Sequence, residues 1–211
     1  MRPAGRYRRP VPRTTPRRTQ QERTEATTTA LVAAARELFA QDGFAATSLD
    51  AVVARAGVTK GALYHHFAGK RELFAAVFAG EQRRLLAELG LAYEENAERD
   101  PWTALERGCA AFLEFTQEPG VQRIFLLDAT AALGWERIRE LESESLALMQ
   151  LGIERAVEAG QIQARPAAPL AHLLFGGICE IAMVVARSPD QRGAHREAAE
   201  ELGRLLEALR T

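Results

Sequence analysis

Hydrophobic residues recur every three or four positions along most of the chain, and this spacing predicts helices rather than strands. Glycine, proline and short polar stretches interrupt the pattern and separate about nine predicted helices. These helices are expected near residues 25–41, 48–56, 59–67, 70–93, 101–117, 121–133, 135–159, 169–187 and 191–209. No stretch alternates convincingly as a strand would, so the sequence predicts an all-α fold.

Two of the predicted helices are short and close together, within the segment TSLDAVVARAGVTKGALYHHFAGK at residues 47–70. Ser48 stands where the first should begin, and Gly57 falls where a left-handed backbone would end it. Thr59 then opens the second helix, with Leu63 expected to face inward. Two short helices joined by a tight glycine-containing turn are typical of a helix-turn-helix, whose second helix presents its first residues to DNA bases.

The polar side chains outside this motif are of the types that bind DNA. Hydroxyl and backbone N–H groups at helix starts suit phosphate oxygens, and a lysine at the start of the second helix can reach guanine acceptors. A glycine beside that lysine would let the helix approach a base closely. The candidate residues are Thr47, Ser48, Thr59, Lys60, Gly61, Tyr64, His65, His66 and Lys70. The alternative is an ordinary helical hairpin with a solvated polar face.

The same segment resembles the DNA-binding domain of TetR-family transcriptional regulators over about residues 25–80. The matching residues are Gly43-Phe44, Thr47-Ser48, Ala56-Gly57-Val58-Thr59, Gly61, Leu63-Tyr64, His66-Phe67 and Lys70. The resemblance implies phosphate contacts for Thr47, Ser48, Tyr64, His66 and Lys70. It implies base contacts for Thr59, Lys60 and Gly61, and either packing or a backbone contact for His65. Beyond residue 80 only the length and the all-helical character match the family.

The net charge of −1 hides an uneven distribution along the chain. Residues 1–23 carry eight arginines and one glutamate, so this segment is +7 and the remaining chain is −8. The segment is rich in proline and poor in large apolar residues, which predicts disorder. It is either a solvated tail or an arm that adds phosphate contacts or enters the minor groove. A helix-turn-helix DNA-binding domain (24–70) and a helical ligand-binding and dimerisation domain (71–211) are expected to follow it.

The last two predicted helices have large apolar surfaces. The helix at 169–187 is apolar on nearly all sides, and the helix at 191–209 has one apolar stripe that includes Leu205 and Leu206. A monomer could bury both by folding them inward. The TetR resemblance implies instead that they pair with their copies in a homodimer, whose two heads would bind a near-palindromic operator in double-stranded DNA. The apolar stretch 170–186 is expected to be too short for a comfortable membrane span.

Large apolar side chains between residues 102 and 175 and two carboxylates within apolar runs form a candidate ligand site. The members chosen are Phe112, Phe115, Asp128, Trp135, Met149, Phe175 and Glu180. Aromatic and methionine stripes are more often core than pocket, and each carboxylate could instead face solvent or pair with an arginine. The resemblance implies a small, largely apolar ligand of unknown identity. Such a ligand alters DNA binding only if it prefers one of two conformations.

The remaining chemistry favours no enzyme and no cofactor. Cys109 and Cys179 lie far apart in apolar settings without a metal pattern, which indicates buried thiols in a cytoplasmic protein, with a redox-sensing pair as the alternative. We find no phosphate-binding glycine loop, zinc motif or catalytic nucleophile motif. The chain is therefore interpreted as a ligand-responsive repressor released by a small molecule. The alternatives are a constitutive or activating DNA-binding protein without a ligand, and an enzyme with an accessory helix-turn-helix.

Overall fold

The computed structural model describes residues 19–94 and 100–211, and within these ranges it contains helices and no strand beyond an isolated bridge between Ile162 and Arg210. The predicted all-α class is confirmed, with more helices than the nine expected. The elements are α1 (Gln20–Ala46), α2 (Leu49–Ala56), α3 (Lys60–His66), α4 (Lys70–Glu94), α5 (Pro101–Phe115), α6 (Pro119–Val121), the π-helix η1 (Gln122–Leu127), α7 (Ala129–Leu133), α8 (Trp135–Leu141), α9 (Ser143–Glu158), α10 (Ala167–Arg187) and α11 (Gln191–Glu207). The predicted arm lies outside the described residues up to residue 18, and α1 begins within its last few residues.

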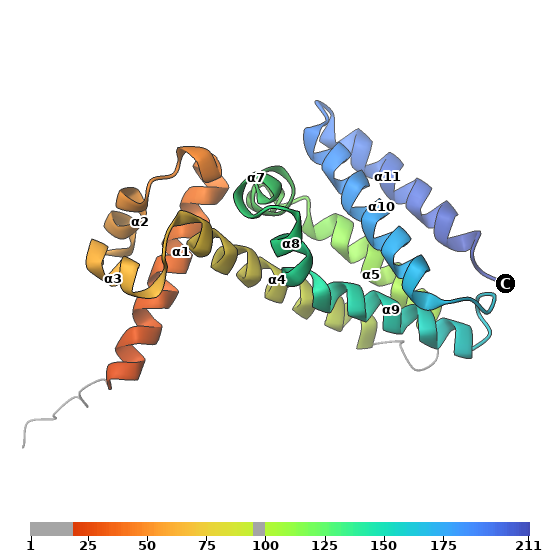
Figure 1. Cartoon of the computed structure of the whole chain (residues 1–211). Coiled ribbons are helices and arrows are strands. Elements are labelled where there is room, and N and C mark those ends of the chain that lie inside the picture. Colours follow the sequence, from red (N-terminus) through yellow and green to blue (C-terminus); the bar gives the residue numbers. More distant parts are fainter. Residues whose placement is uncertain (1–18, 95–99) are drawn as a thin grey trace, which may run out of the picture.

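Helices α1, α2 and α3 form a head at one end of the molecule, and α4 runs from this head along the rest of the chain (Figure 1). The core of the head contains three aromatic rings that meet edge to face or tilted, from Phe39, Phe44 and Phe74. Because Phe74 belongs to α4, the head and this long helix share one core. A movement of α4 therefore carries the head with it.

Helix α1 extends further than predicted, to Ala46, across a kink at Gly43. The backbone of Gly43 has φ 84°, a conformation that glycine adopts readily. A Cβ at this position would lie 3.1 Å from a carboxylate oxygen of Asp128, so a side chain would also press against this neighbour. The predicted stop at Gly43 is thus a sharp bend, after which one short turn continues.

Helices α5, α9, α10 and α11 form the body, and α5 packs directly against α4, which runs along one side (Figure 1). The predicted start of α5 is confirmed, because Asp100 caps the helix by accepting the Thr103 N–H at 3.0 Å and Pro101 is its first residue. By length and composition alone α10, with 21 residues, could cross a membrane, although a core helix of a folded protein meets the same criterion. In this fold α10 packs against α9 and α11.

Two predicted helices are broken in the structure. The segment 121–133 is divided among the end of α6, the π-helix η1 and α7, with the N–H of Asp128 donating to the carbonyl of Arg123 at 2.9 Å. The segment 135–159 is divided at Glu142 into α8 and α9. Both breaks lie beside long-range contacts, and local hydrophobic spacing carries no information about such contacts.

Candidate DNA-binding surface and ligand cavity

The ends of α2 and α3 are fixed by the residues that the sequence singled out. The hydroxyl of Ser48 accepts the Ala51 N–H at 3.1 Å, and that of Thr59 accepts the Ala62 N–H at 3.2 Å. Between them Gly57 ends α2 in the left-handed conformation, with φ 66°. Each hydroxyl uses its oxygen as an acceptor and keeps its own proton free to donate to a phosphate.

Six of the predicted DNA-binding residues are exposed on this motif. They are Ser48, Thr59, Lys60, Gly61, Tyr64 and His65. A Cβ added to Gly61 would meet only the Thr59 hydroxyl, at 4.0 Å. Packing within the protein therefore does not require a glycine at position 61. Close approach of another molecule, such as DNA, would explain why a side chain is absent there.

Lys60 is bound to a neighbouring carboxylate in the free protein. Its Nζ lies 2.7 Å from an Asp50 oxygen, and both side chains are exposed. The hydrogen bond to Asp50 raises the pKa of Lys60 above its ordinary value. Exposed ion pairs stabilise a protein by only about 1 kcal/mol or less, so a competing acceptor could replace Asp50.

Lys70 is directed into the protein rather than toward the surface. Its ammonium donates to the carbonyls of Phe44 at 2.8 Å, Ala45 at 3.1 Å and Thr47 at 3.0 Å, and it lies 4.6 Å from the centre of the Phe44 ring. All three of its donors are therefore used at the end of α1. The structure thus gives Lys70 a capping role, and the phosphate contact that the resemblance implied would require this ammonium to leave those carbonyls.

Thr47 and His66 also have partners inside the head. Thr47 is buried, and its hydroxyl lies 2.8 Å from the Gly43 carbonyl and 3.2 Å from that of Leu38. The Nδ1 atom of His66 lies 3.3 Å from the Thr28 hydroxyl of α1. The Thr47 hydroxyl thus holds the end of α1, and the Nδ1 contact of His66 joins α3 to α1, while the phosphate contacts expected of both residues stay predictions.

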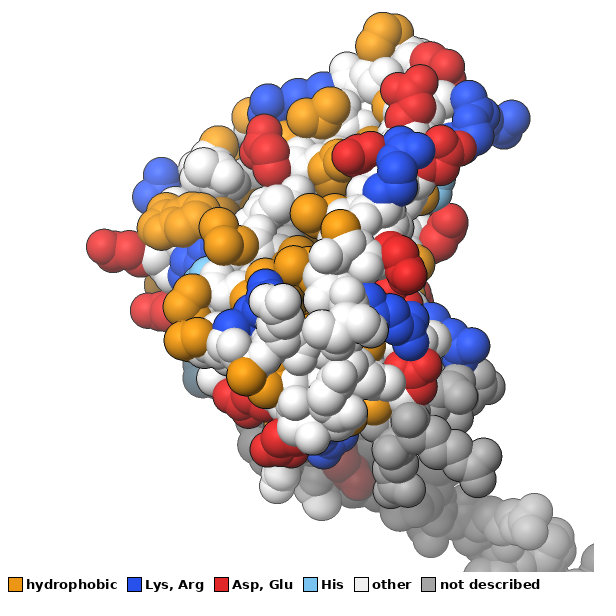
Figure 2. Space-filling model, turned by 90° about the vertical axis from the view of Figure 1, so that its right-hand side faces the viewer, with side chains coloured by type: hydrophobic (Ala, Val, Ile, Leu, Met, Phe, Trp, Pro, Cys, Tyr) orange, Lys and Arg blue, Asp and Glu red, His pale blue; other side chains and the backbone are white. Residues whose placement is uncertain are grey.

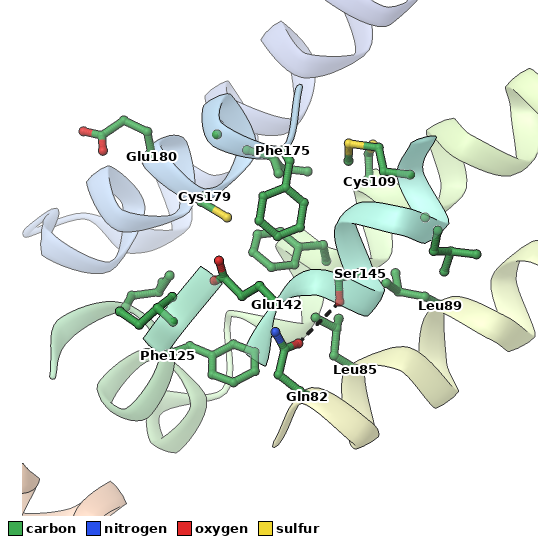
Figure 3. A pocket seen from close by; sticks show the side chains of 18 of the residues that line it. Gln82, Leu85, Leu89, Cys109, Phe125, Glu142, Ser145, Phe175, Cys179 and Glu180 are labelled. Carbon is green, nitrogen blue, oxygen red and sulfur yellow. Dashed lines mark hydrogen bonds between the residues drawn. The ribbon is translucent and has the colours of Figure 1, made fainter. Parts of the chain in front are cut away.

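A cavity of about 370 Å³ lies between α4, α5, η1 and α8–α10 (Figure 3). Its lining is mostly apolar, and its volume falls within the roughly 300–1,000 Å³ common for small-molecule sites. Five of the seven predicted ligand residues line it: Phe112, Trp135, Met149, Phe175 and Glu180. The structure thus brings together predicted aromatic side chains from three separate helices, α5, α8 and α10.

The other two predicted ligand residues have different positions. Phe115 does not line the cavity but packs directly behind its wall, in a small core with Val121 and the lining residue Leu85. Asp128 accepts a hydrogen bond from the Phe44 N–H at 2.7 Å, so it joins the end of η1 to the head. The Asp128 carboxylate thus has a specific partner, as its position in an apolar run suggested. That partner is the backbone amide of Phe44.

Five polar residues of the cavity were not selected from the sequence: Gln82, Thr130, Arg139, Glu142 and Ser145. Arg139 pairs with Glu142 at 3.3 Å, and the Ser145 hydroxyl donates to Gln82 at 3.5 Å. Burial raises the pKa of Glu142 above its ordinary value, although the nearby Arg139 acts in the opposite direction. These residues occupy segments with an ordinary mixture of polar and apolar positions, so no local signal marked them.

Both cysteines line the same cavity. Burial raises the pKa of Cys109 and of Cys179 to about 12. The thiolate is the reactive form of cysteine, and both side chains are held as thiols at neutral pH. Their environment therefore favours the packing role over the redox alternative. The described residues contain no group of three side chains able to hold a metal ion.

A ring of four charges joins the head to the body. Arg36 of α1 binds Glu81 of α4, and it also binds Glu118 at 2.6 Å. Arg84 closes the ring by contacting Glu81 and, at 2.9 Å, Glu118. Glu81 is buried, and its two arginine partners supply the compensation that a buried carboxylate needs.

Comparison with known proteins agrees with this arrangement. Residues 31–77 match the family model described as bacterial regulatory proteins of the tetR family, and residues 102–209 match the tetracyclin repressor-like C-terminal domain. The Transposon Tn10 TetC protein of Escherichia coli is 27% identical over 165 residues, which are 78% of this chain and 82% of that protein. The HTH-type transcriptional regulator AcrR of Shigella flexneri is 34% identical over 52% of this chain and 50% of its own length.

The fold is also similar to that of a solved regulator. A TetR-family transcriptional regulator from Pectobacterium atrosepticum superimposes with a TM-score of 0.76 and 34% identity, over 92% of this chain and 98% of its own. Members of this family are transcriptional regulators, typically ligand-responsive repressors, that bind DNA through the N-terminal helix-turn-helix. With both domains matched in order, this chain belongs to the TetR family of bacterial transcriptional regulators.

Proposed function

We propose that this protein represses transcription in the cytoplasm as a homodimer on a near-palindromic operator, and that a small molecule in the cavity releases it. The observation that carries this proposal is a direct connection between the cavity and the head. Phe125 lines the cavity from η1, and Asp128, immediately after η1, holds the Phe44 N–H of α1. A ligand that prefers one position of η1 would thereby favour one position of the head.

Exposed apolar side chains on α10 and α11 support the dimer. Leu173 is 72% exposed, Val184 57% and Leu205 51%. Figure 2 views the molecule from the side of these helices, and hydrophobic side chains cross the middle of that face. Large apolar groups gathered on a surface favour a partner that excludes water. A second copy bound there would set the two heads at the separation of two operator half-sites.

The exposed residues of the helix-turn-helix would make the DNA contacts. Ser48, Thr59 and Tyr64 have hydroxyl groups suited to phosphates, and Lys60 and Gly61 lie at the start of α3, where base edges are read. His65 is exposed beside Tyr64 and could touch the backbone. The arginine-rich residues 1–18 would add sequence-independent phosphate contacts and so increase the salt dependence of binding.

The test is a titration of the full-length protein on DNA from upstream of its own gene, with scrambled DNA of equal length as the control. Two salt concentrations should be used. We expect specific, salt-sensitive binding with two protomers per site, and reporter expression that rises when the gene for the protein is deleted. Equal binding to both DNAs at both salt concentrations, with no change in the reporter, would contradict this function.

The constitutive alternative requires a body without a ligand site. The mostly apolar cavity of about 370 Å³ favours the ligand-responsive form, because its volume and lining are those of small-molecule sites. Operator binding that no small molecule alters, together with a reporter that falls on deletion, would favour the activating alternative.

A further inference from the structure

The cavity already contains a planar cation that belongs to the protein. The guanidinium of Arg139 lies 4.1 Å from the centre of the Trp135 ring and 5.4 Å from that of Phe175. Its Nη1 atom is 3.3 Å from a carboxylate oxygen of Glu142. Aromatic faces beside a carboxylate are a favourable environment for a flat organic cation, because the electron-rich rings and the negative charge attract it together.

Glu142 provides the negative charge of this arrangement. Its side chain is only 16% exposed, and its carboxylate points into the cavity in the direction of Phe175 and Cys179 (Figure 3). The 3.3 Å contact with Arg139 is longer than the roughly 2.7–2.9 Å of a strong charged hydrogen bond. The buried carboxylate is thus incompletely compensated, and a closer cation would stabilise it.

Arg139 is able to leave this position. Its side chain is 29% exposed, and α8 places it at the edge of the cavity beside the exposed Trp135. Moving the guanidinium into water would free the face of Trp135, the edge of Phe175 and the oxygens of Glu142 at the same time. Water hydrates the displaced charge, so the exchange has a small electrostatic cost.

We propose that the cavity binds a flat aromatic cation, which takes the place of the Arg139 guanidinium beside Glu142 and against the rings of Trp135 and Phe175. This rests on the proposed role of the cavity as the effector site and specifies the class of its ligand. The apolar lining accommodates the hydrocarbon part of the ligand, and Gln82 offers an amide on the same side as Glu142 (Figure 3). An anion would lie against Glu142, and an uncharged ligand would leave the Arg139–Glu142 pair in place.

The test compares three fluorescent probes on the free, full-length protein. Thioflavin T is a flat aromatic cation. The benzothiazole that lacks its ring N-methyl group has nearly the same shape without the charge, and 8-anilinonaphthalene-1-sulfonate is an anion. We expect thioflavin T to bind about tenfold more tightly than its uncharged analogue, and the anion to bind most weakly.

Two variants separate the roles of the charged residues. Glu142→Gln should weaken thioflavin T about tenfold and leave the uncharged analogue within twofold. Arg139→Gln should strengthen thioflavin T several-fold, because the internal competitor is gone. The matched control is the Arg137–Glu140 pair, which has the same spacing on α8, is exposed and lies outside the cavity lining. Arg137→Gln and Glu140→Gln should leave all three affinities within twofold.

Several outcomes would overturn this inference: equal binding of the charged and uncharged probes, tightest binding of the anion, or weaker thioflavin T binding in Arg139→Gln. The absence of binding by any probe to the folded protein would overturn it as well. None of these results requires DNA, so operator release by some other compound would still support the proposed function. Charge-dependent probe binding without any effect of small molecules on the operator would support the inference and oppose the function.

Discussion

Lys60 and Lys70 are the only lysines of the chain, and their surroundings assign them different roles. Lys60 is exposed and has one weak, exchangeable partner in Asp50. Lys70 donates to three carbonyls at the end of α1 and has no donor left for DNA. The ammonium group of Lys60 is thus available to contact DNA, whereas that of Lys70 stabilises the fold.

Replacing Lys60 by alanine should therefore change DNA binding, whereas replacing Lys70 should change the stability of the protein. Lys60→Ala should lower the preference for operator over random DNA by about 1–3 kcal/mol, because a base contact is lost, and leave thermal unfolding nearly unchanged. Lys70→Ala should destabilise the protein by about 1.5–3 kcal/mol, because charged hydrogen bonds to the carbonyls are lost. Arg71→Ala, exposed on the same helix, is the stability control. A Lys70→Ala protein with wild-type stability would contradict the capping role.

The sequence identifies the residue types of the proposed DNA-binding surface, but it does not show which side chains point outward and which point into the protein. Ser48, Thr59 and Gly57 were assigned correctly as helix caps, because capping depends on neighbours a few residues away. The ammonium of Lys70 differs from them in that it binds carbonyls at the end of α1, up to 26 residues earlier in the chain. Such partners exist only once the helices are packed.

At the scale of elements, the π-helix η1 connects the cavity to the head. A π-helix holds an extra residue in its turn, and such turns are frequent at functional sites. Phe125 from η1 contacts the Phe78 ring of α4, with centroids 4.6 Å apart, and lines the cavity. Asp128 then fixes the Phe44 N–H. The sequence showed one continuous helix here because the hydrogen bond that organises the junction spans 84 residues.

Removing the Asp128 carboxylate should loosen the junction between η1 and α1. Asp128→Ala leaves the Phe44 N–H without its acceptor, so we expect a loss of about 1–3 kcal/mol in the free energy of unfolding. Hydrogen exchange at the Phe44 amide should become faster. Glu136→Ala, at an exposed position of α8, should change neither quantity. Unaltered exchange at Phe44 in Asp128→Ala would show that the junction is held by other contacts.

In the whole molecule, the apolar residues of α11 divide into buried and exposed ones, although they form a single stripe in the sequence pattern. Leu206 is 2% exposed and packs in the body, whereas Leu205 beside it is 51% exposed. Hydrophobic spacing identifies which residues avoid water, but not whether they do so within one chain or between two. The proposed dimer surface therefore depends on exposure in the folded chain, which the sequence alone does not contain.

These neighbouring leucines provide a paired test of the dimer. Leu205→Glu should place a charge in each half of the interface and convert the dimer to a folded monomer at micromolar concentration. Leu206→Glu should instead lower the thermal stability strongly, because it introduces an unpaired charge into the core. Light scattering combined with thermal unfolding distinguishes the two effects. A Leu205→Glu protein that remains a dimer would remove α11 from the interface.

The contact between Lys60 and Asp50 has a consequence for the time that the protein needs to find its operator. If Lys60 reads a base as we propose, then on random DNA it can stay folded back against Asp50, and the carboxylate repels the phosphates beside it. The head would then move along random DNA, bound chiefly through phosphate contacts that do not depend on the base sequence. A site that attracts the lysine more strongly than Asp50 does would slow the movement, and the weak ion pair would oppose that capture only slightly.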